Sequence, residues 1–200
     1  MKYLLLLFLL CFALSATAAN ATRLRYERFE GKALITGHGT CFAISDSQLL
    51  TAAHNVLDAK DKPYTTIIVE DDFGWTKCTV VKFSIKYDIA LLQIDTPHAT
   101  ISTVLKLAEK DLLNGEVTLI GSKRGIPLAE NKGIIVERHH QGTVRDCMKV
   151  DFDHGDSGGP VLNSGVVIGM AVAGVPKDGD LDHSVGLFIP VSIIKEFLNK

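Results

Sequence analysis

The chain has 200 residues, with 21 basic and 23 acidic side chains and a formal net charge of −2. This balance argues against nucleic acid or an anionic membrane surface as the main partner. Hydrophobic residues make up 46% of the chain, which is enough for one domain, or two small fused domains, with a real core.

The amino-terminal segment has the pattern of a secretory signal peptide. Lys2 precedes an apolar run over residues 4–14, and the small residues Ala16 and Ala18 follow it. The run is too short for a membrane-spanning helix. We therefore expect a signal peptide at residues 1–19, one domain at residues 20–200, and a secreted or periplasmic protein without a stable membrane anchor.

Three cysteines, Cys41, Cys78 and Cys147, follow this segment. An odd number in an oxidising compartment allows one disulfide and a free thiol, or no disulfide, and the spacing matches no metal site. We expect no metal and no cofactor, and a fold that does not depend on a dense disulfide framework.

Many short runs rich in Val, Ile, Thr and Phe alternate with Gly, Asp, Asn and Pro, which predicts an all-β sandwich or barrel. A polar connection between Ala99 and Asn114 divides them into two groups of about six, at about 30–100 and about 112–191. Only the last ten residues have a helical pattern, with Ile194 and Phe197 on one face. The expected strands are GHGTCFAIS, QLLTAAH, TTIIVED, WTKCTVVKFS, DIALLQI, GEVTLIG, KGIIVER, CMKVDFD, PVLN, VVIGMAVAG and VGLFIPV.

Two polar residues stand at the ends of apolar strands in the first group. His54 ends the strand LLTAAH, and Asp88 comes directly before the apolar run IALLQI. A half-buried aspartate at such a place is costly unless it has partners. Taken singly, each residue is more often structural than catalytic.

The stretch HGDSGGPV, residues 154–161, contains three glycines and a proline, more than a tight turn needs. Its glycines allow unusual dihedral angles, so N–H groups beside Ser157 can point at one place without obstruction by side chains. Serine acyl transfer needs a base, an acid that holds the base, and donors where the oxyanion forms. His154 lies too near Ser157 in the chain to act as the base, and we expect it to line a substrate cleft.

Together these segments resemble the chymotrypsin-like (trypsin-like) serine endopeptidases, in which TAAH, DIALL and GDSGGP occur in the order His, Asp, Ser. Other serine hydrolases place these roles in different chain orders. The resemblance extends from about Gly37 to Val191, and it is to the compact bacterial members with a single protease domain.

The resemblance implies two six-stranded antiparallel β-barrels, a short carboxy-terminal helix and a site between the barrels. Ser157 would be the nucleophile, His54 the general base and then acid, and Asp88 the group that orients the imidazole. The N–H groups of Gly155 and Ser157 would form the oxyanion hole. The implied enzyme is a monomer that acts on protein or peptide substrates. The substrate backbone would pair with residues 172–174, Val172, Ala173 and Gly174.

Specificity and activation depart from the best-known members. Asp151 stands where trypsins place the carboxylate of the specificity pocket, and Gly174 and Gly186 match the glycines that keep that pocket open, so a preference for Lys or Arg is one expectation. The disulfides that hold this loop in trypsins are missing, and the alternative is that Asp151 is a surface carboxylate.

The segment IVGG, which supplies a buried amino terminus in many members, is also missing. Asp156 would then need another partner, because an unpaired buried carboxylate is costly. The candidates are Arg124, Lys132 and Arg138.

Two alternatives belong to other functional classes. A catalytically silent binding module on the same fold would usually have lost a triad residue, and all three are present. An esterase would place its serine in a nucleophile elbow between a strand and a helix, which the loop around Ser157 does not match.

Overall fold

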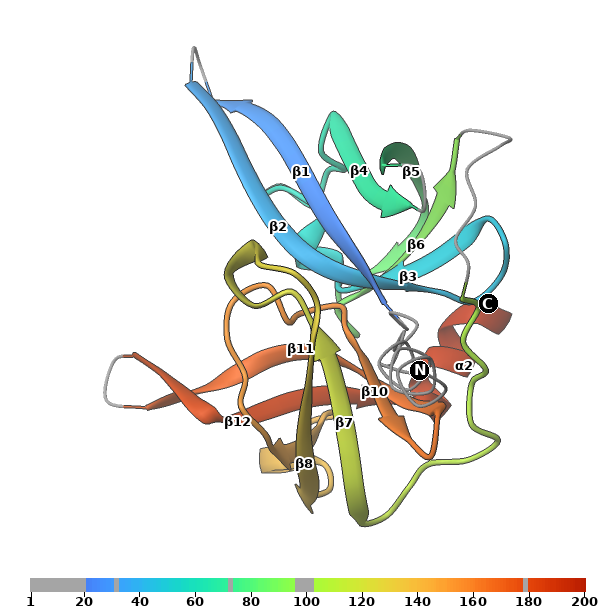
Figure 1. Ribbon diagram of the computed structural model, residues 1–200, viewed down its shortest axis with the longest axis vertical. Helices are drawn as coiled ribbons and strands as arrows, with labels where there is room; N and C mark the ends of the chain where they lie inside the picture. The colour runs from blue at the N-terminus through green and yellow to red at the C-terminus, as the bar shows by residue number, and fades with distance from the viewer. Residues whose placement is uncertain (1–20, 31–32, 72–73, 96–102, 178–179) are drawn as a thin grey trace, which may run out of the picture.

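The computed structural model describes residues 21–30, 33–71, 74–95, 103–177 and 180–200 (Figure 1). The expected signal peptide lies outside these residues. The strands form two closed barrels, each with six strands paired antiparallel, and one short α-helix closes the chain. The predicted all-β fold of two six-stranded antiparallel barrels with a carboxy-terminal helix is therefore confirmed.

The first barrel has the strand order β1-β2-β3-β6-β5-β4, and the second has the order β10-β11-β12-β9-β8-β7. In Figure 1 the first barrel lies above the second, and α2, Val191–Asn199, lies beside the junction. The strands of the first barrel are β1 Thr22–Glu30, β2 Ala33–Ala43, β3 Gln48–Thr51, β4 Thr66–Asp71, β5 Gly74–Ser84 and β6 Ile89–Ile94. Those of the second are β7 Gly115–Gly121, β8 Ala129–Glu137, β9 Asp146–Lys149, β10 Pro160–Asn163, β11 Val166–Lys177 and β12 Asp180–Pro190.

Strand β6 shows how the apolar pattern builds both the barrel and its junction. Its residues alternate between two clusters: Ala90 and Leu92 fill the interior of the first barrel, whereas Ile89 and Leu91 face a cluster shared with the second barrel. Since side chains alternate along a strand, a run that is apolar on both faces must be covered on both. This burial places Asp88, the residue before β6, at the edge of the junction.

The shared cluster joins the barrels and the helix into one core. It contains Phe42 and Leu50 from the first barrel and Met170 from the second, and Ile194 and Phe197 of α2 pack into it. The apolar face predicted for the last ten residues is the face that the helix buries. Within the described residues, no helix combines the length and the apolar character that crossing a membrane requires.

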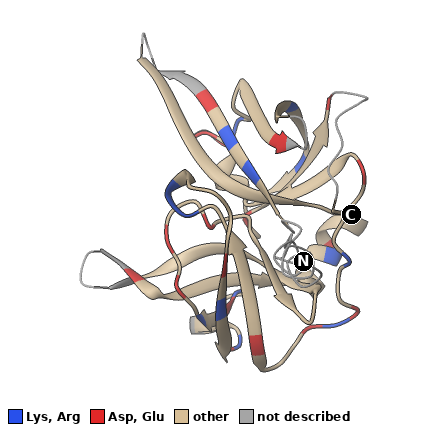
Figure 2. Cartoon of the chain, in the orientation of Figure 1, with Lys and Arg blue, Asp and Glu red and all other residues tan. Residues whose placement is uncertain are grey.

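Basic and acidic side chains are interspersed along both barrels (Figure 2). Several of them are paired with each other, as in the ion pairs Arg25–Glu27 at 3.0 Å and Arg124–Asp153 at 2.7 Å. Opposite charges therefore lie close together rather than in separate fields.

Candidate active site

His54 lies in a short 3-10 helix, Ala53–Asn55, that follows β3. The small buried residues Ala52 and Ala53 let this turn pack against the barrel, while the side chain of His54 stays 49% exposed. Its ring atom Nδ1 lies 2.8 Å from Oδ2 of Asp88 and 3.1 Å from Oδ1. The structure therefore brings the predicted base and its predicted carboxylate into direct hydrogen bonding.

Asp88 is held in place by its backbone and by its partners. Its φ of 56° lies in the left-handed region, which aspartate and asparagine tolerate better than most residues. Its Oδ1 also accepts the backbone N–H of His54 at 3.0 Å. Burial alone would raise the pKa of Asp88, but the hydrogen bonds and charge of His54, with Arg145 nearby, hold this pKa below its ordinary value. The carboxylate is therefore ionised beside the imidazole.

Ser157 is 8% exposed and lies in the loop before β10, where its carbonyl accepts a hydrogen bond from Asn55, the residue after His54. Its hydroxyl donates to the carbonyl oxygen of Val172 at 3.2 Å. Val172 is the extra residue of a bulge in β11, where the pairing with β12 shifts. A bulge re-aims the backbone locally, and here the carbonyl of Val172 meets the serine.

The directions of the N–H groups of Gly155 and Ser157 follow from the hydrogen bonds that the carbonyls of the same peptide groups accept. The carbonyl before Gly155, that of His154, accepts the N–H of Arg124 at 2.6 Å, and the carbonyl before Ser157, that of Asp156, accepts the N–H of Gly159 at 3.0 Å. In a trans peptide the N–H points opposite to the carbonyl, so both N–H groups turn away from these bonds. Neither donates to another group among the described residues, so the predicted oxyanion donors are free.

The first barrel holds this loop through contacts that the sequence did not reveal. The N–H of Thr40 donates to the carbonyl of Ser157 at 3.0 Å, and its hydroxyl donates to that of Gly155 at 2.7 Å. Asn55 also donates to the carbonyl of Ser157, at 2.8 Å. Gly158 has a φ of 85°, and a Cβ there would stand 2.0 Å from the carbonyl oxygen of Thr40. The two barrels therefore meet tightly at the serine loop.

Asp156 has no cationic partner among the described residues, contrary to our expectation. Arg124 pairs with Asp153 at 2.7 Å, and Arg138 pairs with Asp146 at 2.5 Å. Asp156 Oδ2 accepts the N–H of Asp153, while Oδ1 is buried without a hydrogen bond. The expectation was wrong because Arg124 and Arg138 pair with other buried carboxylates, and Lys132 lines an open cavity without an ion pair to Asp156. Burial raises the pKa of Asp156 to about 6.

This raised pKa makes the free energy of unfolding depend on pH. Below about pH 4 the carboxyl is protonated in both folded and unfolded chains, and above pH 6 the folded chain holds a buried carboxylate that the unfolded chain solvates. Stability from this group is therefore lost as the pH rises. The free energy of unfolding of Asp156→Asn minus that of the wild type should be about 2 to 3 kcal/mol larger at pH 8 than at pH 4. Urea unfolding at both pH values measures this change.

The control for this experiment is Asp46→Asn, which removes an exposed carboxylate. Its stability should follow that of the wild type at both pH values. If the curves of Asp156→Asn and the wild type stayed parallel, the buried carboxyl would have an ordinary pKa and an unseen partner.

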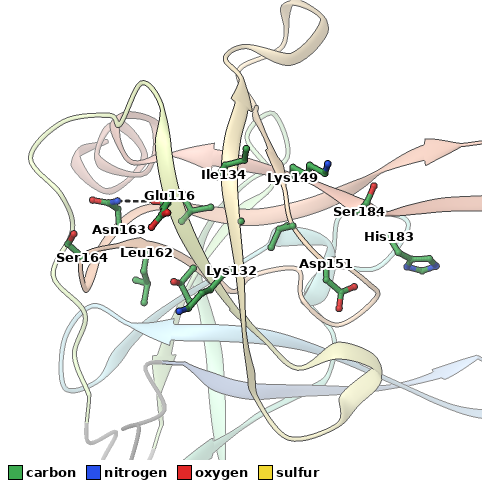
Figure 3. Close-up of a pocket in the computed structure, with 14 residues that line it drawn as sticks. Glu116, Lys132, Ile134, Lys149, Asp151, Leu162, Asn163, Ser164, His183 and Ser184 are labelled. Atoms are coloured by element: carbon green, nitrogen blue, oxygen red, sulfur yellow. Dashed lines mark hydrogen bonds between the residues drawn. The ribbon is translucent and has the colours of Figure 1, made fainter.

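Asp151 has an exposed side chain on the surface of the second barrel. Its side chain is 67% exposed and pairs with Lys123 at 2.5 Å. It lines an open cavity of about 980 Å³ on the second barrel, together with Lys132, Lys149 and His183 (Figure 3). None of the other residues predicted to bind substrate lines this cavity. Lys123 thus partly neutralises the Asp151 carboxylate, which was expected to bind a basic side chain of the substrate.

Apolar side chains occupy the space beside Gly186. Gly186 pairs with Gly174 across β11 and β12, as the two predicted pocket glycines should. A Cβ at Gly186 would lie 3.0 Å from Met148 and 3.1 Å from Phe152. Phe152 is 2% exposed, so an aromatic ring, not a carboxylate, adjoins this glycine.

His38, a residue that the sequence analysis did not single out, lies beside the serine loop. A Cβ at Gly155 would stand 2.9 Å from its Cδ2, and one at Gly125 would stand 3.2 Å from its Cγ. Burial and the neighbouring His154 lower the pKa of His38. The neutral form of His38 is therefore favoured. His154 is exposed, and its place in a substrate cleft stays a prediction.

Comparisons with known proteins agree with this geometry. The family model described as a trypsin-like peptidase domain matches residues 39–170. The protein "Putative protease Do-like 3, mitochondrial" of Arabidopsis thaliana is 28% identical over 172 residues, which cover 80% of this chain and 29% of that protein. "Magnetosome formation protease MamE" of Paramagnetospirillum magneticum is 23% identical over 170 residues, 80% of this chain and 23% of that protein. The chain spans less than a third of the length of these relatives.

Solved structures share the fold. The active form of the Rv3671c protease from M. tuberculosis gives a TM-score of 0.73 with 20% identity, covering 92% of this chain and 82% of that chain. The inactive form gives a TM-score of 0.70 with 21% identity, covering 92% of this chain and 89% of that one. At this identity the likeness extends to the fold alone.

Proposed function

Because the chain belongs to the trypsin-like peptidase domain family, we propose that it is a serine endopeptidase that cleaves peptide bonds through an acyl-enzyme. Ser157 is the nucleophile, His54 the general base and then acid, and Asp88 the partner of the base. The observation that carries this proposal is the 2.8 Å contact between His54 Nδ1 and Asp88 Oδ2. An ionised carboxylate there keeps the proton on Nδ1, so that Nε2 is free to accept another.

The proposed reaction uses four groups of this chain. When a peptide binds, the hydroxyl of Ser157 leaves the carbonyl of Val172 and passes its proton to Nε2 of His54 as Oγ attacks the scissile carbonyl. The N–H groups of Gly155 and Ser157 hold the developing oxyanion. His54 then protonates the leaving amine, and a water molecule, deprotonated by His54, hydrolyses the acyl-enzyme. Catalytic contacts that are loose without substrate commonly tighten in this way on binding.

The proposed substrates are protein or peptide segments in an extended conformation. Such a segment would pair its backbone with residues 172–174 of β11, as an added strand. The apolar setting of Gly186 and the ion pair of Asp151 with Lys123 favour an uncharged side chain before the scissile bond over Lys or Arg. The amino-terminal pattern at residues 1–19 supports action outside the cytoplasm, as a secreted or periplasmic protein.

Labelling by a serine-directed fluorophosphonate tests the proposal. Ser157 should be modified stoichiometrically, because attack on phosphorus needs the same base and donors as attack on a carbonyl. Peptide mass spectrometry identifies the modified residue. His54→Ala should remove the labelling, whereas His139→Asn, on the loop between β8 and β9, should keep it. An unlabelled protein with native near-ultraviolet circular dichroism would favour the silent binding module instead.

A further inference from the structure

Three side chains of different ligand type converge where β8 turns into β9. A carboxylate oxygen of Glu137, a ring nitrogen of His140 and Sγ of Cys147 all lie within 4.8 Å of one another. The sulfur is buried, the imidazole is partly covered and the carboxylate is exposed. The group is therefore open on one side only. It includes none of the residues of the candidate active site.

The backbone builds this convergence. Glu137 stands opposite Cys147 in the ladder between β8 and β9, next to a shift in register. His139 then takes a left-handed conformation with φ 52° and ψ 51°, and His140 folds back. The N–H of His140 donates to the carbonyl of Arg145 at 2.7 Å, which closes the loop. In this position Nδ1 of His140 lies 2.5 Å from the carboxylate of Glu137.

A buried ion pair fixes the loop from within. Asp146 is fully buried, and its Oδ2 lies 2.5 Å from Nε of Arg138. Its Oδ1 accepts the N–H of His139 at 2.9 Å. Because the residues before His140 and before Cys147 are both tied to this pair, the ligand side chains sit on a framework that needs no refolding to bind an ion.

We propose that Glu137, His140 and Cys147 form a site for a borderline-soft divalent cation, with Zn²⁺ as the best fit. Thiolate, imidazole and carboxylate are the ligands that zinc takes in proteins, and three protein ligands leave a fourth, tetrahedral position to water. Tetrahedral ligands at zinc distances lie about 3.3 to 3.8 Å apart. The observed separations, from 2.5 Å between His140 and Glu137 up to a limit of 4.8 Å, span this range. As the S–Zn bond forms, the thiol proton of Cys147 passes to solvent.

An ion pair between His140 and Glu137 alone would not explain why the sulfur of Cys147 lies beside them. A pair between His140 and Glu137 contributes little in water and gains nothing from a sulfur beside it. The spacing of the cysteines led us to expect no metal. Such spacing identifies sites with several cysteine ligands, and it cannot identify a site with one. Cys147 also precedes Ser157 by ten residues, so a bound ion would anchor the start of the segment that carries the serine.

Cobalt binding tests the site without reference to peptidase activity. The full chain carrying Ser157→Ala, which cannot digest itself, is titrated with Co²⁺ under reducing conditions. We expect one equivalent to bind with a sulfur-to-cobalt absorption band, and Zn²⁺ to displace it. Cys147→Ser should lose the band, and His140→Gln or the exposed Glu137→Gln should weaken binding at least tenfold. His139→Asn should bind as the parent does.

Several outcomes would overturn the proposal. These are the absence of the sulfur band in the folded parent, its persistence in Cys147→Ser, or unchanged affinity in both His140→Gln and Glu137→Gln. A band that persisted would place the cobalt at another cysteine of the chain. Failure here would leave fluorophosphonate labelling of Ser157 unaffected, so the two proposals are tested separately.

Discussion

Ser157→Ala is expected to lower kcat for a cleaved peptide by about 10⁶-fold, with KM changed only a few fold. The substitution removes only the hydroxyl group, and the N–H groups of Gly155 and Ser157 stay in place. Substrate therefore still binds, but no acyl-enzyme can form. Cleavage of a chromogenic peptide, with kcat and KM measured separately, tests this. The double variant Ser157→Ala/His54→Ala should be no slower, because the two residues act as one unit.

The matched control is Ser47→Ala, at an exposed serine in the turn between β2 and β3. It should keep full activity. Residual kcat within tenfold of the wild type in Ser157→Ala would mean that another group is the nucleophile, and the assignment of the serine loop would be wrong.

Asp88→Asn is expected to lower kcat by about 10⁴-fold while the protein stays folded. Asparagine tolerates the left-handed φ of 56°, and its carbonyl oxygen can still accept the backbone N–H of His54. Its amide group then faces Nδ1 as a donor, so the ring proton moves to Nε2. That nitrogen can no longer accept the proton of Ser157.

Asp61→Asn is a close control, because Asp61 is also an aspartate of the first barrel with a positive φ, 58°, and it is exposed. Its kcat should match that of the wild type, and thermal unfolding of both variants reports any loss of structure. If Asp88→Asn kept its kcat, the 2.8 Å contact with His54 would be structural rather than catalytic.

Local sequence predicted much of the fold. Strands such as β6 and β7 carry an apolar pattern that only a strand with buried faces explains, and these lie where expected. Strand β1 was not expected, because TRLRYERFE alternates charges with few β-branched residues. Its stability comes from pairing with β2 and β4 on either side, and no short window of sequence contains that information.

The parts of the candidate site that lie in short sequence motifs were open to prediction, and the contacts that support them were not. His54, Asp88 and Ser157 were predicted from short motifs in a set chain order, and the structure joins His54 to Asp88 by a hydrogen bond. The support of the serine loop by Thr40 depends on a contact 115 residues apart in the chain, between common residue types. The partner of Asp156 was wrongly expected for a related reason: the rule that buried charges are paired cannot tell which carboxylate takes which arginine.

The contacts of Thr40 and Asn55 with the carbonyl of Ser157 have a consequence for synthesis and folding. The first barrel, which emerges first from the ribosome, contains His54 and Asp88 but not Ser157. The shared core also includes α2, which follows both barrels in the chain. A chain that has folded only its first barrel therefore cannot assemble the proposed site. In the finished protein, peptidase activity would report the docking of the barrels more sensitively than any measure of their strand content.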